Sequence, residues 1–315
     1  MRSETINQSF DCGPEAYFSL SNIRGKVNIL PGKEHVITIR AEKLLDTGDG
    51  ENTLVELSQD SGGRVFARTR SGDPGFQIFH RKKPCKVNYQ VSVPEKCQLK
   101  VRGVCNPAQI EGISGEIDIY TVSGNLVLQT LNGDLKIESV SGDVACEDVN
   151  AAVKLKTVSG DVHFKNSILP SLRCKTVSGD LILDAPIGAG PYDFDAVSGD
   201  IEWKIGPNSG ATITSLSLSG KVQTSLPITF SKHSHSHRFY EIMGGGVEIH
   251  HKSVSGDFLL SKNDHVVDLQ EMTVLGKPQT ELFSNEEILA GIERGEISVQ
   301  EAVGLIERGH HSPVG

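Results

Sequence analysis

The sequence predicts an all-β fold: a single-stranded β-solenoid of nonapeptide half-coils, taken as right-handed by general prevalence, with a C-terminal helix pair. Three observations predict it. Apolar residues recur on a nine-residue rhythm, Ser-Gly-Asp turns recur at about twice that spacing, and two helix-capping sequences lie near the C-terminus. These features divide the chain into an N-terminal β region (1–98), a β-solenoid (99–275), and a linker with a short amphipathic helix pair (276–315).

The N-terminal β region follows the nine-residue rhythm less regularly than the solenoid does. Phe18, Val27 and Val36 keep the nine-residue step. From about Leu54 to Val93 the pattern changes to alternating strands separated by Gly/Asp turns, which is typical of hairpins. We therefore expect this region to supply the first coils, together with hairpins that cap one end of the solenoid.

In the solenoid region, each repeat places apolar residues at x, x+2 and x+5 and restarts at x+9. One unit consists of Leu126, Leu128 and Leu131, and the next unit starts at Leu135. The step from x to x+2 is that of a strand with one face inward, whereas an amphipathic helix would need apolar residues at i, i+3, i+4 and i+7. We expect the x+5 residue to close the corner of the coil with its side chain inside.

Ser-Gly-Asp turns mark alternate nonapeptides, which indicates that two nonapeptides make one coil. The glycine supplies a positive φ, and the aspartate bonds the local backbone. The glycines Gly142, Gly160 and Gly179 show that successive coils grow slightly longer. The additional residues enter on the opposite edge, around 166–171, 185–192 and 205–211.

Two capping boxes predict the C-terminal helix pair. The segments SNEE (284–287) and SVQE (298–301) each place a serine three residues before a glutamate, and Gly295 and Gly309 follow as stops. Two helices this short cannot hold a core by themselves, so we expect them to bind a protein partner or a second copy of the chain. The residues expected to form this partner-binding face are Ile288, Leu289, Ile292, Ala302, Leu305 and Ile306.

Charge and composition exclude some classes of function. The net charge of -9 argues against nucleic-acid binding, which needs a basic face. No stretch approaches the roughly 18 apolar residues of a membrane span, and the N-terminus shows no apolar signal region. The six cysteines form no CxxC pair, so we expect buried free thiols. A cytoplasmic location is the default expectation.

Acidic residues follow the corner glycines, and several of them should align in a ladder on stacked coils. Calcium is one interpretation, because nonapeptide β-rolls bind it through Gly-Gly-x-Gly-x-Asp turns. Each repeat here has a single glycine, so we interpret the acids as solvated turn residues that bond backbone. The residues concerned are Asp134, Asp143, Asp161, Asp180, Asp200 and Asp257.

The same acidic residues are compatible with an alternative function, that of a carbohydrate-binding or carbohydrate-active solenoid. Carboxylates stacked about 4.8 Å apart approach the separation that glycoside hydrolysis requires. Sugar-stacking aromatic residues are few, with Trp203 as the single tryptophan beside five tyrosines. We therefore predict no enzyme activity, and we place a glycan, if one binds, at the 185–192 edge.

A second alternative is a metal-binding module in a His/Ser-rich segment. His233, His235 and His237 alternate, so in an extended conformation they would share one face and could hold zinc or nickel. The interpretation that we adopt is a solvated polar loop. No metal and no cofactor is therefore assigned.

Several segments resemble a known family. The stretches LSNIRGKVNI, VSVPEKCQLKV, the TVSGDL units and GGGVEIHHKSVSGDFLL are similar to the bacterial putative-adhesin family of unknown function, also called the toastrack domain, over roughly residues 6–262. The tail ILAGIERGEISVQEAVGLIERG resembles short bihelical modules that accompany such domains. The resemblance implies a β-solenoid with a role in assembly or signalling, sometimes linked to envelope stress, and it implies no catalytic residues.

These observations together predict a non-catalytic binding or assembly scaffold. The solenoid would present a long rigid surface, and the C-terminal helices would mediate self-association or recruit a protein partner.

Overall fold

The computed structural model describes residues 2–72, 83–206, 208–234 and 236–263. Over these residues the fold is all-β: strands dominate, and the one helical segment is a 3-10 turn, η1 (Leu45–Thr47). The described residues contain no α-helix, so the predicted fold class is corrected to an all-β fold without the helix pair. That pair and its proposed partner-binding residues lie outside the described residues; these are Ile288, Leu289, Ile292, Ala302, Leu305 and Ile306.

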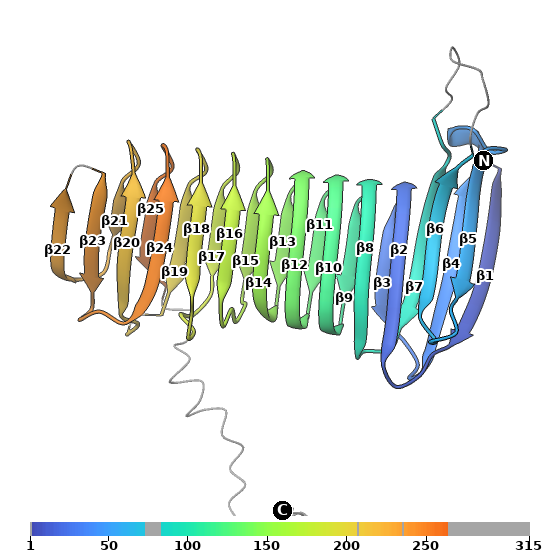
Figure 1. Ribbon diagram of the computed structural model, residues 1–315, viewed down its shortest axis with the longest axis horizontal. Coiled ribbons are helices and arrows are strands. Elements are labelled where there is room, and N and C mark those ends of the chain that lie inside the picture. Colours follow the sequence, from blue (N-terminus) through green and yellow to red (C-terminus); the bar gives the residue numbers. More distant parts are fainter. Residues whose placement is uncertain (1, 73–82, 207, 235, 264–315) are drawn as a thin grey trace, which may run out of the picture. The chain divides into compact units, whose positions relative to one another are not determined.

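Two sheets make up the unit Met1–Leu269 (Figure 1). Sheet A contains, in spatial order, β1 (Ser3–Asp11), β4 (Val36–Leu44), β7 (Lys86–Val93), β3 (Val27–Pro31), β9 (Ala108–Glu111), β11 (Leu126–Gln129), β13 (Val144–Glu147), β15 (Val162–Lys165), β17 (Leu181–Asp184), β19 (Ile201–Ile205), β25 (Phe258–Lys262) and β21 (Val222–Thr224). Sheet B contains, in spatial order, β22 (Ile228–Ser234), β23 (His237–Ile242), β20 (Ala211–Ser217), β24 (Val247–Ser253), β18 (Tyr192–Ala196), β16 (Leu172–Thr176), β14 (Asn150–Thr157), β12 (Asn132–Ser141), β10 (Ser114–Ser123), β8 (Cys97–Cys105), β2 (Ala16–Arg24), β6 (Val65–Ser71) and β5 (Thr53–Gln59).

Each coil of the stack consists of one sheet B strand followed by one sheet A strand. Neighbouring coils pair in parallel, so that Leu126 lies beside Val144 and Ile119 beside Ile137. Along β11 the burial alternates, with Leu126 and Leu128 inside. This confirms the predicted x, x+2 strand, and the inward side chains of both sheets form one continuous core.

The two corners of a coil differ, which corrects the expectation that every x+5 residue points inward. At the corner after sheet A strands, Leu131 and Val149 are fully buried. At the corner after sheet B strands, Val140 and Val158 are 39% and 47% exposed. The same apolar pattern therefore marks an inside position at one corner and an outside position at the other.

Backbone geometry explains the difference between the corners. The longer sheet B strands keep their alternation to the end, so Ser139 faces inward and the next residue, Val140, faces outward. At the other corner Thr130 and Asp148 have φ values of 53° and 55°, and this left-handed step turns the following residue into the core.

Antiparallel strands lie at the N-terminal end of the stack. In sheet A, β4 pairs antiparallel with both β1 and β7. In sheet B, β5 and β6 form an antiparallel pair that joins the stack through β2.

At the other end of the stack, the order of coils in space differs from their order in the sequence. The coil formed by β24 and β25 inserts between the coil of β18 and β19 and the coil of β20 and β21. The antiparallel hairpin of β22 and β23 then covers β20 in sheet B. The coil that carries Ile249 and Phe258 therefore occupies an internal place in the stack.

The cysteines are free, and five of the six are buried. Cys97 and Cys174 lie on inward positions of sheet B, and burial raises the pKa of each thiol to about 12. These thiols act as small apolar core groups, as predicted. No helix in the described part of the chain has the length and apolar character to cross a membrane.

Candidate functional site

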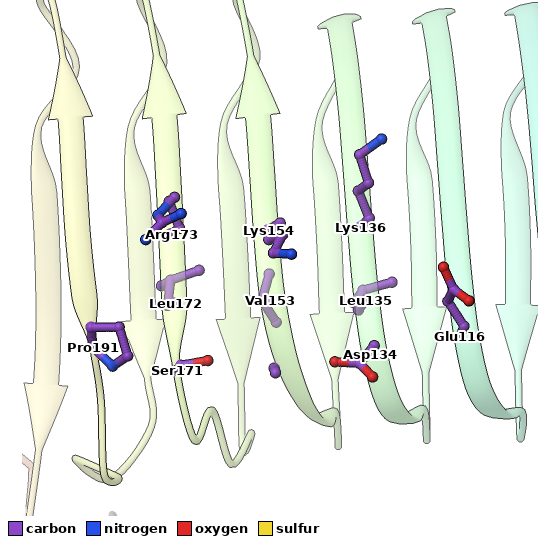
Figure 2. Close-up of a pocket in the computed structure, with 11 residues that line it drawn as sticks. Glu116, Asp134, Leu135, Lys136, Val153, Lys154, Ser171, Leu172, Arg173 and Pro191 are labelled. Atoms are coloured by element: carbon purple, nitrogen blue, oxygen red, sulfur yellow. The ribbon is translucent and has the colours of Figure 1, made fainter.

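The outer face of sheet B carries a hollow of about 450 Å³ near the start of the central strands (Figure 2). We call it the sheet B groove. Its central outward side chains lie on β12, on β14, and on β16 with the residue that precedes it, in two parallel rows. These side chains are Asp134, Lys136, Ala152, Lys154, Ser171 and Arg173.

Small residues create the hollow. Parallel register places Asp134 beside Ala152, and Ser171 lies at the same level on the next strand. Ala152 and Ser171 have short side chains that rise little above the sheet. Asp134 and Pro191 stand on either side of Ser171 (Figure 2). The groove therefore has a low floor between two taller walls.

Three cations form a row two residues further along the chain from this floor. We call it the cation row, and it consists of Lys136, Lys154 and Arg173. The register places Lys136 beside Lys154 and Lys154 beside Arg173, on strands about 4.8 Å apart. Like charges that face each other across neighbouring strands destabilise a sheet. The row therefore concentrates positive potential on a chain whose net charge is -9.

The outer members of the cation row are paired with carboxylates on the flanking strands. The ammonium of Lys136 lies 3.8 Å from Asp118, and the guanidinium of Arg173 lies 3.1 Å from Asp193. Lys154, in the middle, forms no ion pair with any described residue. It is the cation that remains available to a ligand.

A second row of charges lies two residues further along the same strands. Lys156 and Lys175 are each paired with a carboxylate there, at 3.6 Å to Glu138 and 2.8 Å to Asp195. Lys136 also reaches Glu138, at 3.1 Å, and this hydrogen bond holds the pKa of the Glu138 carboxyl below its usual range. The same bond raises the pKa of Lys136.

The opposite end of the groove is acidic. Asp134 lies on its wall, and Glu116 lies beside it one strand further, where its carboxylate accepts a 2.7 Å hydrogen bond from Gln98. The groove is thus acidic at Glu116 and Asp134 and basic along Lys136, Lys154 and Arg173. A ligand that fits must place its negative group at the basic end.

The sequence did not lead us to predict this site, because its lysines are dispersed along the chain. The signal that would have revealed it is recurrence at the coil period. Asp118, Lys136 and Lys154 are 18 residues apart, and Arg173 follows after 19. Only the coil register turns this spacing into a row.

The predicted acidic ladder exists on the edge that carries the Ser-Gly-Asp turns. The backbone amides of Asp180, Asp200 and Asp257 each donate to the carboxylate of the preceding rung, at 2.9, 2.9 and 2.8 Å. The bonds run between coils rather than within one turn. Asp134 is not a rung, because it lies at the start of β12 in the groove.

The predicted histidine cluster is divided between two strands. His233 is the second-last residue of β22 and His237 begins β23, and the ring centroids of His233 and Tyr240 lie 5.1 Å apart. His235 lies outside the described residues. Among the residues that the structure describes, no three side chains are placed to hold a metal ion.

The aromatic residues near the 185–192 edge face the core. Trp203 and Tyr192 are both fully buried, with ring centroids 4.7 Å apart. The hydroxyl of Tyr192 donates to the carbonyl of Leu169 at 2.7 Å, and burial raises its pKa to about 12. These rings stabilise the coil and do not form a platform for a sugar.

Comparison with known proteins gives a family and distant structural likenesses. No curated protein matches the chain. Solved structures that match include a putative adhesin from Parabacteroides distasonis (8% identity, 82% of this chain and 97% of that chain, TM-score 0.43). Another is a putative adhesin from Bacteroides fragilis (12% identity, 82% and 97%, TM-score 0.42). A third is a putative lipid binding protein from P. distasonis (12% identity, 83% and 96%, TM-score 0.35).

The family model described as Toastrack DUF4097 matches residues 47–261, which is more than half of the chain and includes the groove, the acidic ladder and the inserted coil. The chain therefore belongs to the Toastrack DUF4097 family.

Proposed function

We propose that this protein is a non-catalytic binding scaffold that holds a ligand in the sheet B groove. The observation that carries the proposal is the position of Lys154. It is an unpaired cation between two like charges, above a low floor, on the face of a parallel sheet. Such a charge arrangement costs stability in the free protein, and a ligand of complementary charge would offset the cost.

The construction of the stack supports a scaffold role. Lys136, Lys154 and Arg173 stand on strands that are hydrogen-bonded on both sides, so the charged side chains start from fixed backbone positions. A preformed site loses little conformational entropy when it binds.

The finer parts of this proposal concern partners and location. We propose that the ligand connects the scaffold to a protein partner or to a second copy, in signalling of the envelope-stress kind that the family resemblance implies. We also propose a cytoplasmic location. The free thiols support it, because cysteines persist unpaired in reducing compartments.

A groove-filling substitution tests the proposal. Ala152→Phe would occupy the floor, while Ala145→Phe places the same side chain at an exposed position on the outer face of sheet A. The purified full chain and both variants would be applied to arrays of glycans, phospholipids and short peptides. We expect the wild type and Ala145→Phe to retain the same ligands and Ala152→Phe to lose them.

Equal binding by Ala152→Phe and the wild type would contradict the groove as the site. Chemical conversion of a retained ligand, measured by mass spectrometry, would contradict the non-catalytic part of the proposal.

A further inference from the structure

We propose that the sheet B groove binds a compact phosphate-bearing ligand, with the phosphate against Lys154 and between Lys136 and Arg173. This inference rests on the proposed function and adds the chemical class of the ligand. It does not depend on whether the phosphate belongs to a lipid headgroup or to a soluble molecule.

Five charged residues lie side by side on neighbouring strands at one level of sheet B. In strand order the residues are Asp118, Lys136, Lys154, Arg173 and Asp193. Each outer cation faces a carboxylate, while the central ammonium has neighbours of its own sign on both sides. An anion above Lys154 would be attracted by all three cations at once.

The kind of anion depends on its charge and on its acceptor oxygens. A phosphate monoester carries up to two negative charges and three acceptor oxygens, so it can contact more than one cation. The guanidinium of Arg173 offers a planar set of donors that matches phosphate, and Lys154 adds a point charge. A monocarboxylate offers two acceptor oxygens instead of three, so it can contact fewer of these cations at once.

The flanking carboxylates limit the size of the ligand. Asp118 and Asp193 flank the row, and Glu116 and Asp134 lie at the acidic end of the groove. Carboxylates on these sides repel a long polyanion that runs across the sheet. The basic area is therefore confined to about three strands, or roughly 10 Å, which suits one phosphate or diphosphate group and excludes an extended nucleic acid.

Isothermal titration and amide-shift NMR on the full chain would test the inference, with inorganic phosphate and pyrophosphate as soluble probes. Vesicles of phosphatidylcholine, with and without phosphatidic acid, would serve as the lipid probe. The variants are Lys154→Gln and Arg173→Gln, both at exposed positions. The control is Lys221→Gln, which removes the same charge from an exposed position whose backbone amide alone bonds the acidic ladder.

We expect pyrophosphate or the phosphatidic acid vesicles to bind the wild type, with amide shifts on β12, β14 and β16. Lys154→Gln and Arg173→Gln should each weaken binding about ten-fold or more, as expected for loss of a charge-assisted hydrogen bond, and Lys221→Gln should not. Binding of pyrophosphate would indicate a soluble phosphate, and binding of the vesicles alone would indicate a headgroup.

Three results would overturn the inference. Citrate that binds the groove as tightly as pyrophosphate would remove the phosphate class but would leave the proposed function standing. Absence of binding by every phosphate probe, or equal loss in Lys154→Gln and Lys221→Gln, would also overturn it. The array experiment with Ala152→Phe would still decide whether the groove binds another class of ligand.

Discussion

The backbone amide of Asp161 donates a 3.1 Å hydrogen bond to the carboxylate of Asp143, its counterpart one coil away. The same bond recurs along the edge until the amide of Lys221 closes the ladder on Asp257. The first rung is the side chain of Asn125, whose amide oxygen accepts a hydrogen bond from the backbone N–H of Asp143. Carboxylates thus bridge successive coils while they repel one another at roughly 4.8 Å spacing.

The ladder predicts opposite effects for two substitutions of Asp180. Asp180→Asn keeps an acceptor oxygen and removes a charge between two like charges, so the melting temperature should stay equal or rise, with less dependence on salt. Asp180→Ala removes the acceptor and should cost about 0.5–1 kcal/mol. Thermal unfolding at low and high sodium chloride measures both. If Asp180→Asn were as destabilised as Asp180→Ala, the negative charge itself would be required, as in a bound cation.

The glycine of the Ser-Gly-Asp turn predicts a large loss of stability on substitution. Gly160 has a φ of 108°, and a Cβ there would lie 2.4 Å from the carbonyl oxygen of Gly142. Gly160→Ala should therefore destabilise the fold by at least about 2 kcal/mol through strain and a steric clash. Gly13→Ala is the matched control, because no atom lies within 4 Å of its added Cβ. Urea denaturation that shows the same midpoint for both would contradict the close stacking of the coils.

The two corners of a coil predict unequal effects for one kind of substitution. Val149→Ala removes fully buried methyl groups and should cost about 2 kcal/mol, while Val158→Ala, at a 47% exposed position, should change stability by less than about 0.5 kcal/mol. Chemical denaturation of both variants provides the measurement. Equal losses would show that both valines belong to the core.

A buried histidine makes stability depend on pH. His251 is fully buried, its Nδ1 lies 3.0 Å from the hydroxyl of Ser215, and its ring packs 5.3 Å from that of Phe258. Burial, helped by the charge of Arg238, lowers its pKa from 6.5 to about 4. Between these two values the unfolded chain binds a proton that the folded chain does not, so stability rises with pH.

The contribution of neutral, buried His251 to the free energy of unfolding should be complete above pH 6.5 and should be lost as the pH falls towards 4. From pH 7.5 to pH 5 the loss is on the order of 2 kcal/mol. Denaturation curves across this range should show a smaller slope for His251→Gln than for the wild type. His250→Gln, which removes the exposed neighbour on the same strand, should keep the wild-type slope. Identical slopes for the three proteins would mean that the pKa of His251 is the same in the folded and the unfolded chain.

Sequence periodicity was sufficient to predict the coils but not their corners. Leu128 and Leu131 obey the same pattern as Ile137 and Val140, yet only Val140 is exposed among these four. The difference depends on a backbone step at Thr130, whose φ of 53° is unusual for a β-branched residue and gives no apolar signal.

The groove could not be predicted from any single repeat. Lys154 reads as an ordinary solvated strand residue until its neighbours are known to be Lys136 and Arg173. The coil length decides which residues become neighbours. It changes from 18 to 19 residues because one additional residue lies between β15 and β16. Ala152, which forms the floor, carries no chemical signal in the sequence.

The insertion of the β24–β25 coil has a consequence for biosynthesis. When the chain has been made only as far as Thr224, the coil of β20 and β21 has β18 and β19 as its one available parallel neighbour. The final position between them belongs to residues synthesised later, Val247–Ser253 and Phe258–Lys262. A chain truncated before Val247 would therefore lack an interior layer and not merely an end. Among the described coils, the one that is synthesised last fills the interior position at this end of the stack.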